Sequence, residues 1–155
     1  MELIAIVALV VTSGLLAGFF FSWWCSCIVG LKNVSDAVFV ETMQAVNRIL
    51  PNGRFVVPFF APVILAPICV WLLFAGGETA AGWWSVAATV LSVITFGITA
   101  AGNVPLNNQL EAAGRSDDAA ARIAFEGPWT LLNDLRTGTS FLAFCAAVGA
   151  LATLT

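Results

Sequence analysis

The sequence predicts an all-α integral membrane protein, a bundle of four transmembrane helices with amphipathic surface helices in its two longer connections. The first observation is composition: of 155 residues, 60% are hydrophobic and only 10% are charged, as is typical of membrane proteins. The second is that four apolar runs approach the roughly 20 residues that a helix needs to cross a bilayer. We therefore expect a single membrane domain over residues 1–155, with the lipid bilayer as a partner.

Tryptophan and proline residues help to locate three of these apolar runs in the membrane. The first ends in Trp23 and Trp24, which favour the membrane interface. The second contains three prolines, which should kink the helix yet still let it cross. The fourth begins near Pro128, because proline suits the first turn of a helix. The spans are expected at about residues 3–24, 55–74, 83–101 and 131–154, and the surface helices at about 36–50 and 105–125.

The distribution of charge predicts an orientation. All six basic residues lie in the two longer connections or just inside the last span. The positive-inside rule therefore places these connections in the cytoplasm and both termini outside, in a bacterial-type inner membrane. The formal net charge of −3 and the lack of a basic stripe argue against nucleic acid as a partner.

The residue content also narrows the chemistry. The sequence has no histidine, the commonest ligand of zinc and of haem and non-haem iron, so we expect no metal site. The cysteines all lie inside apolar runs and are interpreted as small buried hydrophobic residues rather than disulfides or metal ligands. They are Cys25, Cys27, Cys69 and Cys145.

The surface helix expected at 36–50 has two different sides. Ser35 can cap its N-terminus, and apolar side chains gather on one side, whereas Glu41 and Gln44 lie on the other. Two interpretations stay open for this polar side. It faces solvent above a membrane-bound apolar side, or Glu41 and Gln44 turn inward to a pocket.

The third span stops in a stretch that is rich in asparagine. Pro105 lacks a backbone N–H, so the helix should break near Asn103 and restart with Pro105 in its first turn. Asn103 and Asn107 would then face roughly the same way. Amides at the end of a span are either structural contacts between helices or the lining of a site.

The fourth span carries a polar stripe, because Trp129, Asn133, Arg136 and Ser140 follow one another at spacings of four, three and four residues. An arginine near a helix end can extend to the headgroups or face the bundle. Since Arg136 shares its side with Trp129 and Asn133, we expect it to face inward and to pair with Glu41.

Three segments occur in order between the spans: Glu41-Thr42-Met43-Gln44-Ala45-Val46-Asn47-Arg48, Asn103-Val104-Pro105-Leu106-Asn107-Asn108-Gln109-Leu110 and Trp129-x-x-x-Asn133-x-x-Arg136-Thr137. Together they resemble the anthrone oxygenase-like family of small membrane proteins. The resemblance implies four membrane helices, and its fungal relatives oxidise the activated methylene of anthrones to a ketone in polyketide pathways, without an established metal or flavin. Here Asp134 follows Asn133, where relatives frequently have histidine, so a histidine base is absent.

The first functional hypothesis is therefore a monooxygenase that acts on a lipophilic aromatic molecule entering from the bilayer. Molecular oxygen is the co-substrate, and no cofactor is predicted. A base must remove a proton from carbon, and a cation or amides must stabilise the resulting oxyanion. Glu41 is the candidate base, and Arg136 stabilises charge. The candidate substrate-binding residues are Gln44, Asn47, Asn103, Asn107, Trp129 and Asn133.

The alternative is a non-catalytic membrane subunit, or a helical bundle that binds a lipid or small molecule, with homo-oligomerisation possible in either case. A transporter is a third hypothesis, weakened by the small size of one chain. An enclosed aromatic pocket would favour the enzyme, whereas direct contacts among the polar side chains would favour a structural role.

Overall fold

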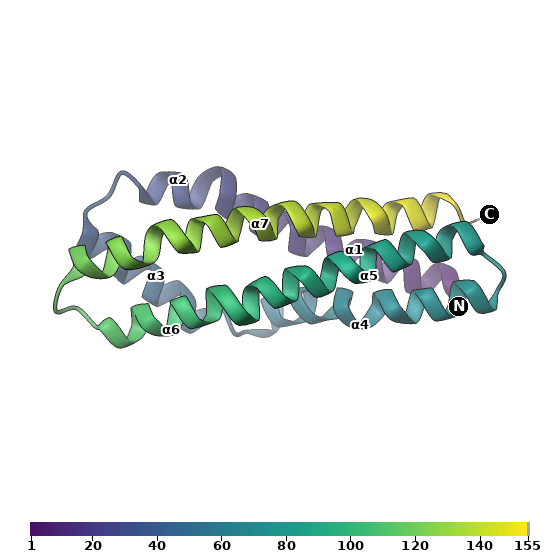
Figure 1. Ribbon diagram of the computed structural model, residues 1–155, viewed down its shortest axis with the longest axis horizontal. Helices are drawn as coiled ribbons and strands as arrows, with labels where there is room; N and C mark the ends of the chain where they lie inside the picture. Colours follow the sequence, from purple (N-terminus) through teal and green to yellow (C-terminus); the bar gives the residue numbers. More distant parts are fainter. Residues whose placement is uncertain (155) are drawn as a thin grey trace.

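The computed structural model describes residues 1–154, which form five continuous helices and no strand (Figure 1). Four of these helices are long and apolar enough to cross a membrane, so the chain is an integral membrane protein with an all-helical fold. The first continuous helix comprises α1 (Glu2–Ser22), a π-helical turn (Trp23–Cys27) and α2 (Ile28–Leu31). It is followed by α3 (Asp36–Ile49) and α4 (Gly53–Ala75). The next continuous helix comprises α5 (Thr79–Ile98), a π-helical turn (Thr99–Asn103) and α6 (Val104–Ala113), and the last helix is α7 (Asp118–Ala152).

The long helices run side by side, and α1 and α5 each pack against both α4 and α7 (Figure 1). Both termini and the α4–α5 turn lie at one end of the bundle, whereas α3 and the α6–α7 turn lie at the other, which we call the α3 end. The core near the termini is rich in small side chains, which lets the helices approach closely. Its buried members are Ile6, Leu9, Ala66, Cys69, Leu73, Ala81, Ala88, Ala146 and Ala147.

The predicted break near Asn103 is wrong, because α5 continues into α6 through the π-helical turn Thr99–Asn103. The N–H of Val104 donates to the carbonyl of Thr99, five residues earlier. This wider turn absorbs the change in hydrogen bonding next to Pro105, which lies in the first turn of α6 as predicted. The asparagine stretch therefore stays helical.

The predicted surface helix at 105–125 is also wrong. Helix α6 ends at Ala113, and Gly114 reverses the chain with φ of 62°, a conformation that favours glycine. Asp117 then caps α7 by accepting a hydrogen bond of 3.0 Å from the N–H of Ala120. The last helix therefore starts well before Pro128, and its 35 residues extend about 52 Å, beyond the roughly 30 Å of a bilayer core.

Helix α3 begins after Ser35, whose side chain accepts a hydrogen bond of 3.4 Å from the N–H of Val38, as predicted. It lies against α6 and α7. Phe39, Val40 and Met43 are fully buried in a second core cluster, together with Phe125 and Trp129 of α7. This cluster holds the α3 end of the bundle together.

Arg122 fixes α7 to the connection between α2 and α3, a role that the sequence did not indicate. Its guanidinium carbon lies 4.5 Å from the centre of the Phe39 ring. Arg122 donates hydrogen bonds to three backbone carbonyls around this connection and to two carboxylates. The acceptors are the carbonyls of Leu31, Lys32 and Val34 and the carboxylates of Asp36 and Glu126, at 2.7–3.3 Å.

The cysteines differ in environment. Only Cys69 is fully buried, whereas Cys25 and Cys145 are exposed on the outside of the bundle and Cys27 is half-buried. The expectation that all four are buried is therefore wrong for Cys25 and Cys145, because membrane spans also present apolar residues to lipid. All four are free thiols.

We expect Arg122→Gln to lower the free energy of unfolding by about 2 kcal/mol or more, because several charged hydrogen bonds are lost at once. Unfolding by detergent titration of the purified protein measures this change. Arg54→Gln is the matched control, since Arg54 is exposed at the start of α4. Equal stabilities of the two variants would contradict the role given to Arg122.

Candidate functional site

A cavity of about 410 Å³ lies between α4, the Thr99–Asn103 turn, α6 and α7, beneath the connection from α3 to α4. This volume is within the range of sites for small molecules. One wall is aromatic and the opposite wall is rich in amides. The apolar lining includes Leu50, Phe55, Val56, Phe59 and Phe60, and the polar lining includes Asn47, Thr99, Asn103, Asn107, Asn108 and Arg136.

Arg136 faces inward, as predicted, and is only 5% exposed. Its guanidinium donates one hydrogen bond of 3.1 Å to the side-chain oxygen of Asn133. The guanidinium carbon lies 4.5 Å from the centre of the Phe20 ring and 5.4 Å from that of Trp129. Within residues 1–154 no carboxylate oxygen comes within 4.0 Å of its nitrogens, and its Nε has no partner. The cavity is therefore lined by a buried cation that no acid neutralises.

Several amide groups around Arg136 also lack partners. Asn103 donates to the carbonyl of Trp129 at 3.5 Å, but its side-chain oxygen accepts no hydrogen bond. The side-chain nitrogens of Asn47 and Asn133 are buried and unpartnered as well. Each such group costs about 1–3 kcal/mol if it stays unsatisfied, so their concentration at one place favours a bound polar ligand or water.

Trp129 lies beside the cavity rather than in its wall. Its Nε1 donates a hydrogen bond of 3.0 Å to the side-chain oxygen of Asn107. Its ring stacks on Phe125 at 5.9 Å and meets the edge of Trp23 at 5.5 Å. With these neighbours and Arg136 around the ring, Trp129 orients Asn107 toward the cavity instead of offering a surface for a substrate.

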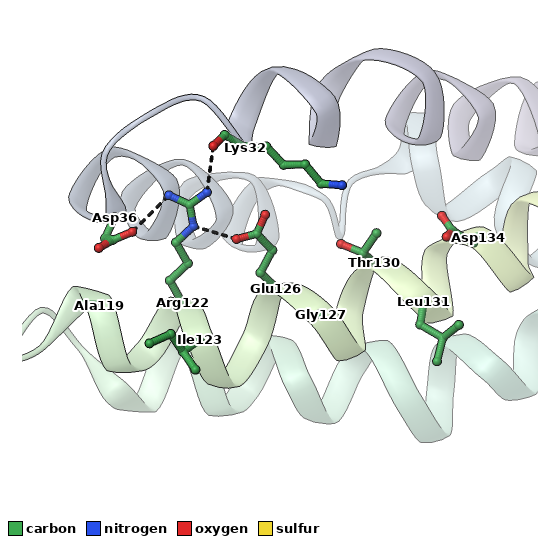
Figure 2. Close-up of a pocket in the computed structure, with 10 residues that line it drawn as sticks. All are labelled: Lys32, Asp36, Ala119, Arg122, Ile123, Glu126, Gly127, Thr130, Leu131 and Asp134. Atoms are coloured by element: carbon green, nitrogen blue, oxygen red, sulfur yellow. Dashed lines mark hydrogen bonds and ion pairs between the residues drawn. The ribbon is translucent and has the colours of Figure 1, made fainter.

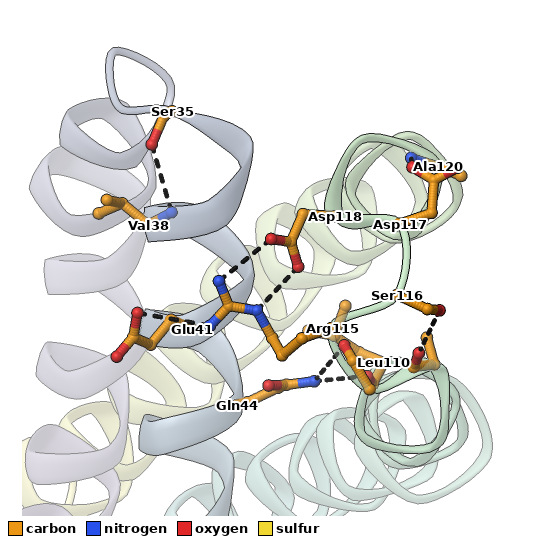
Figure 3. Close-up of polar contacts among 12 residues, drawn as sticks. Ser35, Val38, Glu41, Gln44, Leu110, Arg115, Ser116, Asp117, Asp118 and Ala120 are labelled. Atoms are coloured by element: carbon orange, nitrogen blue, oxygen red, sulfur yellow. Dashed lines mark hydrogen bonds and ion pairs between the residues drawn. The ribbon is translucent and has the colours of Figure 1, made fainter.

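The predicted pair between Glu41 and Arg136 is wrong. The Glu41 side chain is 71% exposed, and its carboxylate lies 3.4 Å from Arg115 in the turn between α6 and α7 (Figure 3). Arg115 also binds Asp118 at 2.8 Å, and this hydrogen bond raises the pKa of its guanidinium. The polar side of α3 that holds Glu41 faces this turn, so Glu41 does not line the cavity.

Gln44 turns inward, but toward the end of α6 and not toward the cavity. Its side chain is buried, and Nε2 donates to the carbonyls of Leu110 at 2.9 Å and Gly114 at 3.2 Å (Figure 3). Leu110 belongs to the last turn of α6, where carbonyls lack helical partners, and Gly114 follows the helix directly. Gln44 therefore stabilises the α6–α7 turn, which corrects its expected role in binding substrate.

The aromatic wall was missed by the sequence reasoning. Phe55 stacks on Phe59 at 5.2 Å, and Phe59 lies 5.5 Å from Phe96 of α5. The spacing of four residues between Phe55 and Phe59 is the signal that would have placed them on one side of α4.

A carboxylate at the cavity was missed as well. Glu111 lines the cavity and forms an ion pair of 2.8 Å with Arg48 of α3. It follows Asn103 and Asn107 at intervals of four residues, so all three lie on the same side of the helix. The cavity thus combines a buried cation and amides, an aromatic wall and one carboxylate that is about half exposed.

One comparison with known protein families matches most of the chain. A family model for anthrone oxygenase matches residues 52–146, which include the aromatic wall, the asparagine stretch and Arg136 but not the segment around Glu41. No curated protein and no solved structure matches the chain. Because the matched segment covers more than half of the sequence, the chain belongs to the anthrone oxygenase family.

Proposed function

We propose that the protein is a membrane-embedded monooxygenase that converts the activated methylene of a lipophilic, phenolic aromatic molecule to a ketone. Molecular oxygen is the co-substrate, and no cofactor takes part. The observation that carries this proposal is the buried guanidinium of Arg136, which has no acidic partner within residues 1–154 and borders an aromatic cavity. Membership of the anthrone oxygenase family supports the same reaction class.

The residues around the cavity fit the charge that this reaction develops. Loss of a proton from a carbon between two aromatic rings gives a carbanion, and its negative charge spreads onto the oxygen of the central ring. Arg136 and the amide nitrogen of Asn47 line the cavity and are donors that stabilise such an oxyanion, whereas Asn133 does not line it and holds Arg136 by accepting its hydrogen bond. The methylene carbon then reduces oxygen and forms a bond to it, and loss of water leaves the ketone. One CH₂ and one O₂ give one C=O and one H₂O, so no external reductant is needed.

Glu111 replaces Glu41 as the proposed proton acceptor. A base must reach the proton that it removes, and Glu111 lines the cavity whereas Glu41 lies outside it. The ion pair with Arg48 holds the Glu111 carboxylate at the cavity.

The substrate is proposed to enter from the bilayer. Phe60 lines the cavity and is 43% exposed, which supports an opening at the aromatic wall. The proposed orientation, with α3 and the α6–α7 turn in the cytoplasm, places the cavity near the cytoplasmic membrane face.

A non-catalytic bundle that binds a small molecule is the second candidate. The hydrogen bonds that join Trp129 to Asn107 and Arg136 to Asn133 are the direct polar contacts that a structural role requires. Oxygen consumption distinguishes the two candidate functions, because the non-catalytic bundle binds an aromatic ligand without consuming oxygen.

We expect Arg136→Gln to lower turnover by about 100-fold or more, because the principal oxyanion donor is lost. The measurement is oxygen uptake and anthraquinone formation from anthrone by protein in nanodiscs. Arg54→Gln, the same change on the exposed surface, should keep wild-type turnover. If wild-type protein binds anthrone but consumes no oxygen, the non-catalytic candidate is correct.

A second pair of variants tests the proton acceptor. Glu111→Gln should lower the same turnover by about 100-fold or more, because general bases contribute at least that much. Glu41→Gln removes an equal charge from the exposed surface and should leave turnover near that of wild type. The reverse result, with Glu41 essential and Glu111 dispensable, would overturn the assignment.

A further inference from the structure

A second concavity of about 720 Å³ lies on the outer surface, between α7 and the connection from α2 to α3 (Figure 2). It shares no lining residue with the cavity next to Arg136. We call it the outer groove, and the residues that matter most in it are Lys32, Arg122, Glu126, Thr130, Leu131 and Asp134.

The outer groove contains one free cation and one free anion. Arg122 is already neutralised by Asp36 and Glu126. In the described part of the chain, neither Lys32 nor Asp134 has an ion-pair partner within 4.0 Å. The Lys32 side chain extends along the groove toward Thr130 and Asp134 (Figure 2). These charges are available to a ligand.

An unsatisfied hydroxyl lies between them. The side-chain oxygen of Thr130 is buried in the lining of the groove and has no hydrogen-bond partner. A polar group in this state favours a ligand or water that supplies the missing hydrogen bond. Ammonium, hydroxyl and carboxylate groups therefore line the same outer groove.

The groove also lies where apolar and polar surfaces of α7 meet. Leu131 is 60% exposed and Leu135 is 48% exposed, so this side of α7 presents apolar side chains to the bilayer. From Asp134 the groove continues to Arg122, twelve residues or about 18 Å further toward the α3 end. If the last span begins near residue 131, as expected from the sequence, this part of the groove lies at the headgroup level of a membrane.

We propose that the outer groove binds a zwitterionic aminophospholipid of the phosphatidylethanolamine type. Lys32 and Thr130 hold the phosphate, Asp134 accepts hydrogen bonds from the primary ammonium, and the acyl chains lie along Leu131 and Leu135. An anionic lipid fits less well, because the lining has three carboxylates and two cations. A choline headgroup has no N–H to donate to Asp134.

Native mass spectrometry of the full chain, released from nanodiscs that contain equal amounts of dioleoyl phosphatidylethanolamine, phosphatidylcholine and phosphatidylglycerol, tests this proposal. Wild-type protein should retain phosphatidylethanolamine preferentially. Lys32→Gln and Asp134→Asn should each reduce that preference about fivefold, the effect of one charge near a membrane surface. Lys32→Arg, which keeps the charge, and Arg54→Gln, which lies outside the groove, should preserve it.

The proposal fails if wild-type protein retains the three lipids equally or prefers phosphatidylglycerol. It also fails if both groove variants, folded as judged by circular dichroism, keep the wild-type preference. Millimolar phosphoethanolamine distinguishes a lipid from a free headgroup. It should leave the retained lipid in place, and complete displacement would overturn a site that depends on acyl chains.

Discussion

A guanidinium inside an apolar bundle is the constraint on which the rest of this structure depends. Removing an arginine from water costs several kcal/mol, and a nearby carboxylate usually offsets part of that cost. Arg136 instead lies against the rings of Phe20 and Trp129 and donates to Asn133. Cation–π contacts and one amide stabilise the cation while leaving its charge available. Such a group is ready to stabilise a negatively charged ligand.

The architecture at the α3 end keeps this cation both buried and accessible. The continuous helices α5–α6 and α7 extend beyond one bilayer thickness and carry their amides to the same level as Arg136. Helix α3 covers these extensions. Its Gln44 donates to the carbonyl of Leu110 near the end of α6, and Arg122 of α7 donates to the carbonyl of Val34 in the α2–α3 connection. The short α4 leaves room beneath the α3–α4 connection, where the aromatic cavity lies. Extra helix length therefore leaves space for this cavity without an additional domain.

Hydropathy and residue spacing predicted the structural features that depend only on residues of one helix. The four spans followed from hydropathy, and the buried stripe through Asn133 and Arg136 followed from spacing alone. The partners of polar side chains depend on contacts between helices, which spacing does not determine. Glu41 and Gln44 lie on one side of α3, yet one meets Arg115 in a turn and the other caps α6. The turn at Gly114 was not predicted, because its neighbours favour a helix and the sequence alone does not show that Gly114 has a positive φ.

The ionisation of a bound dihydroxyanthraquinone, a product-like aromatic with a coloured phenolate, tests the central claim most directly. Visible absorption is followed during a pH titration with wild-type protein in nanodiscs, with Arg136→Gln protein and with empty nanodiscs. If Arg136 stabilises a negatively charged ligand, the phenolate band develops at lower pH with wild-type protein than in the other two samples. Identical titrations in all three samples would contradict the account.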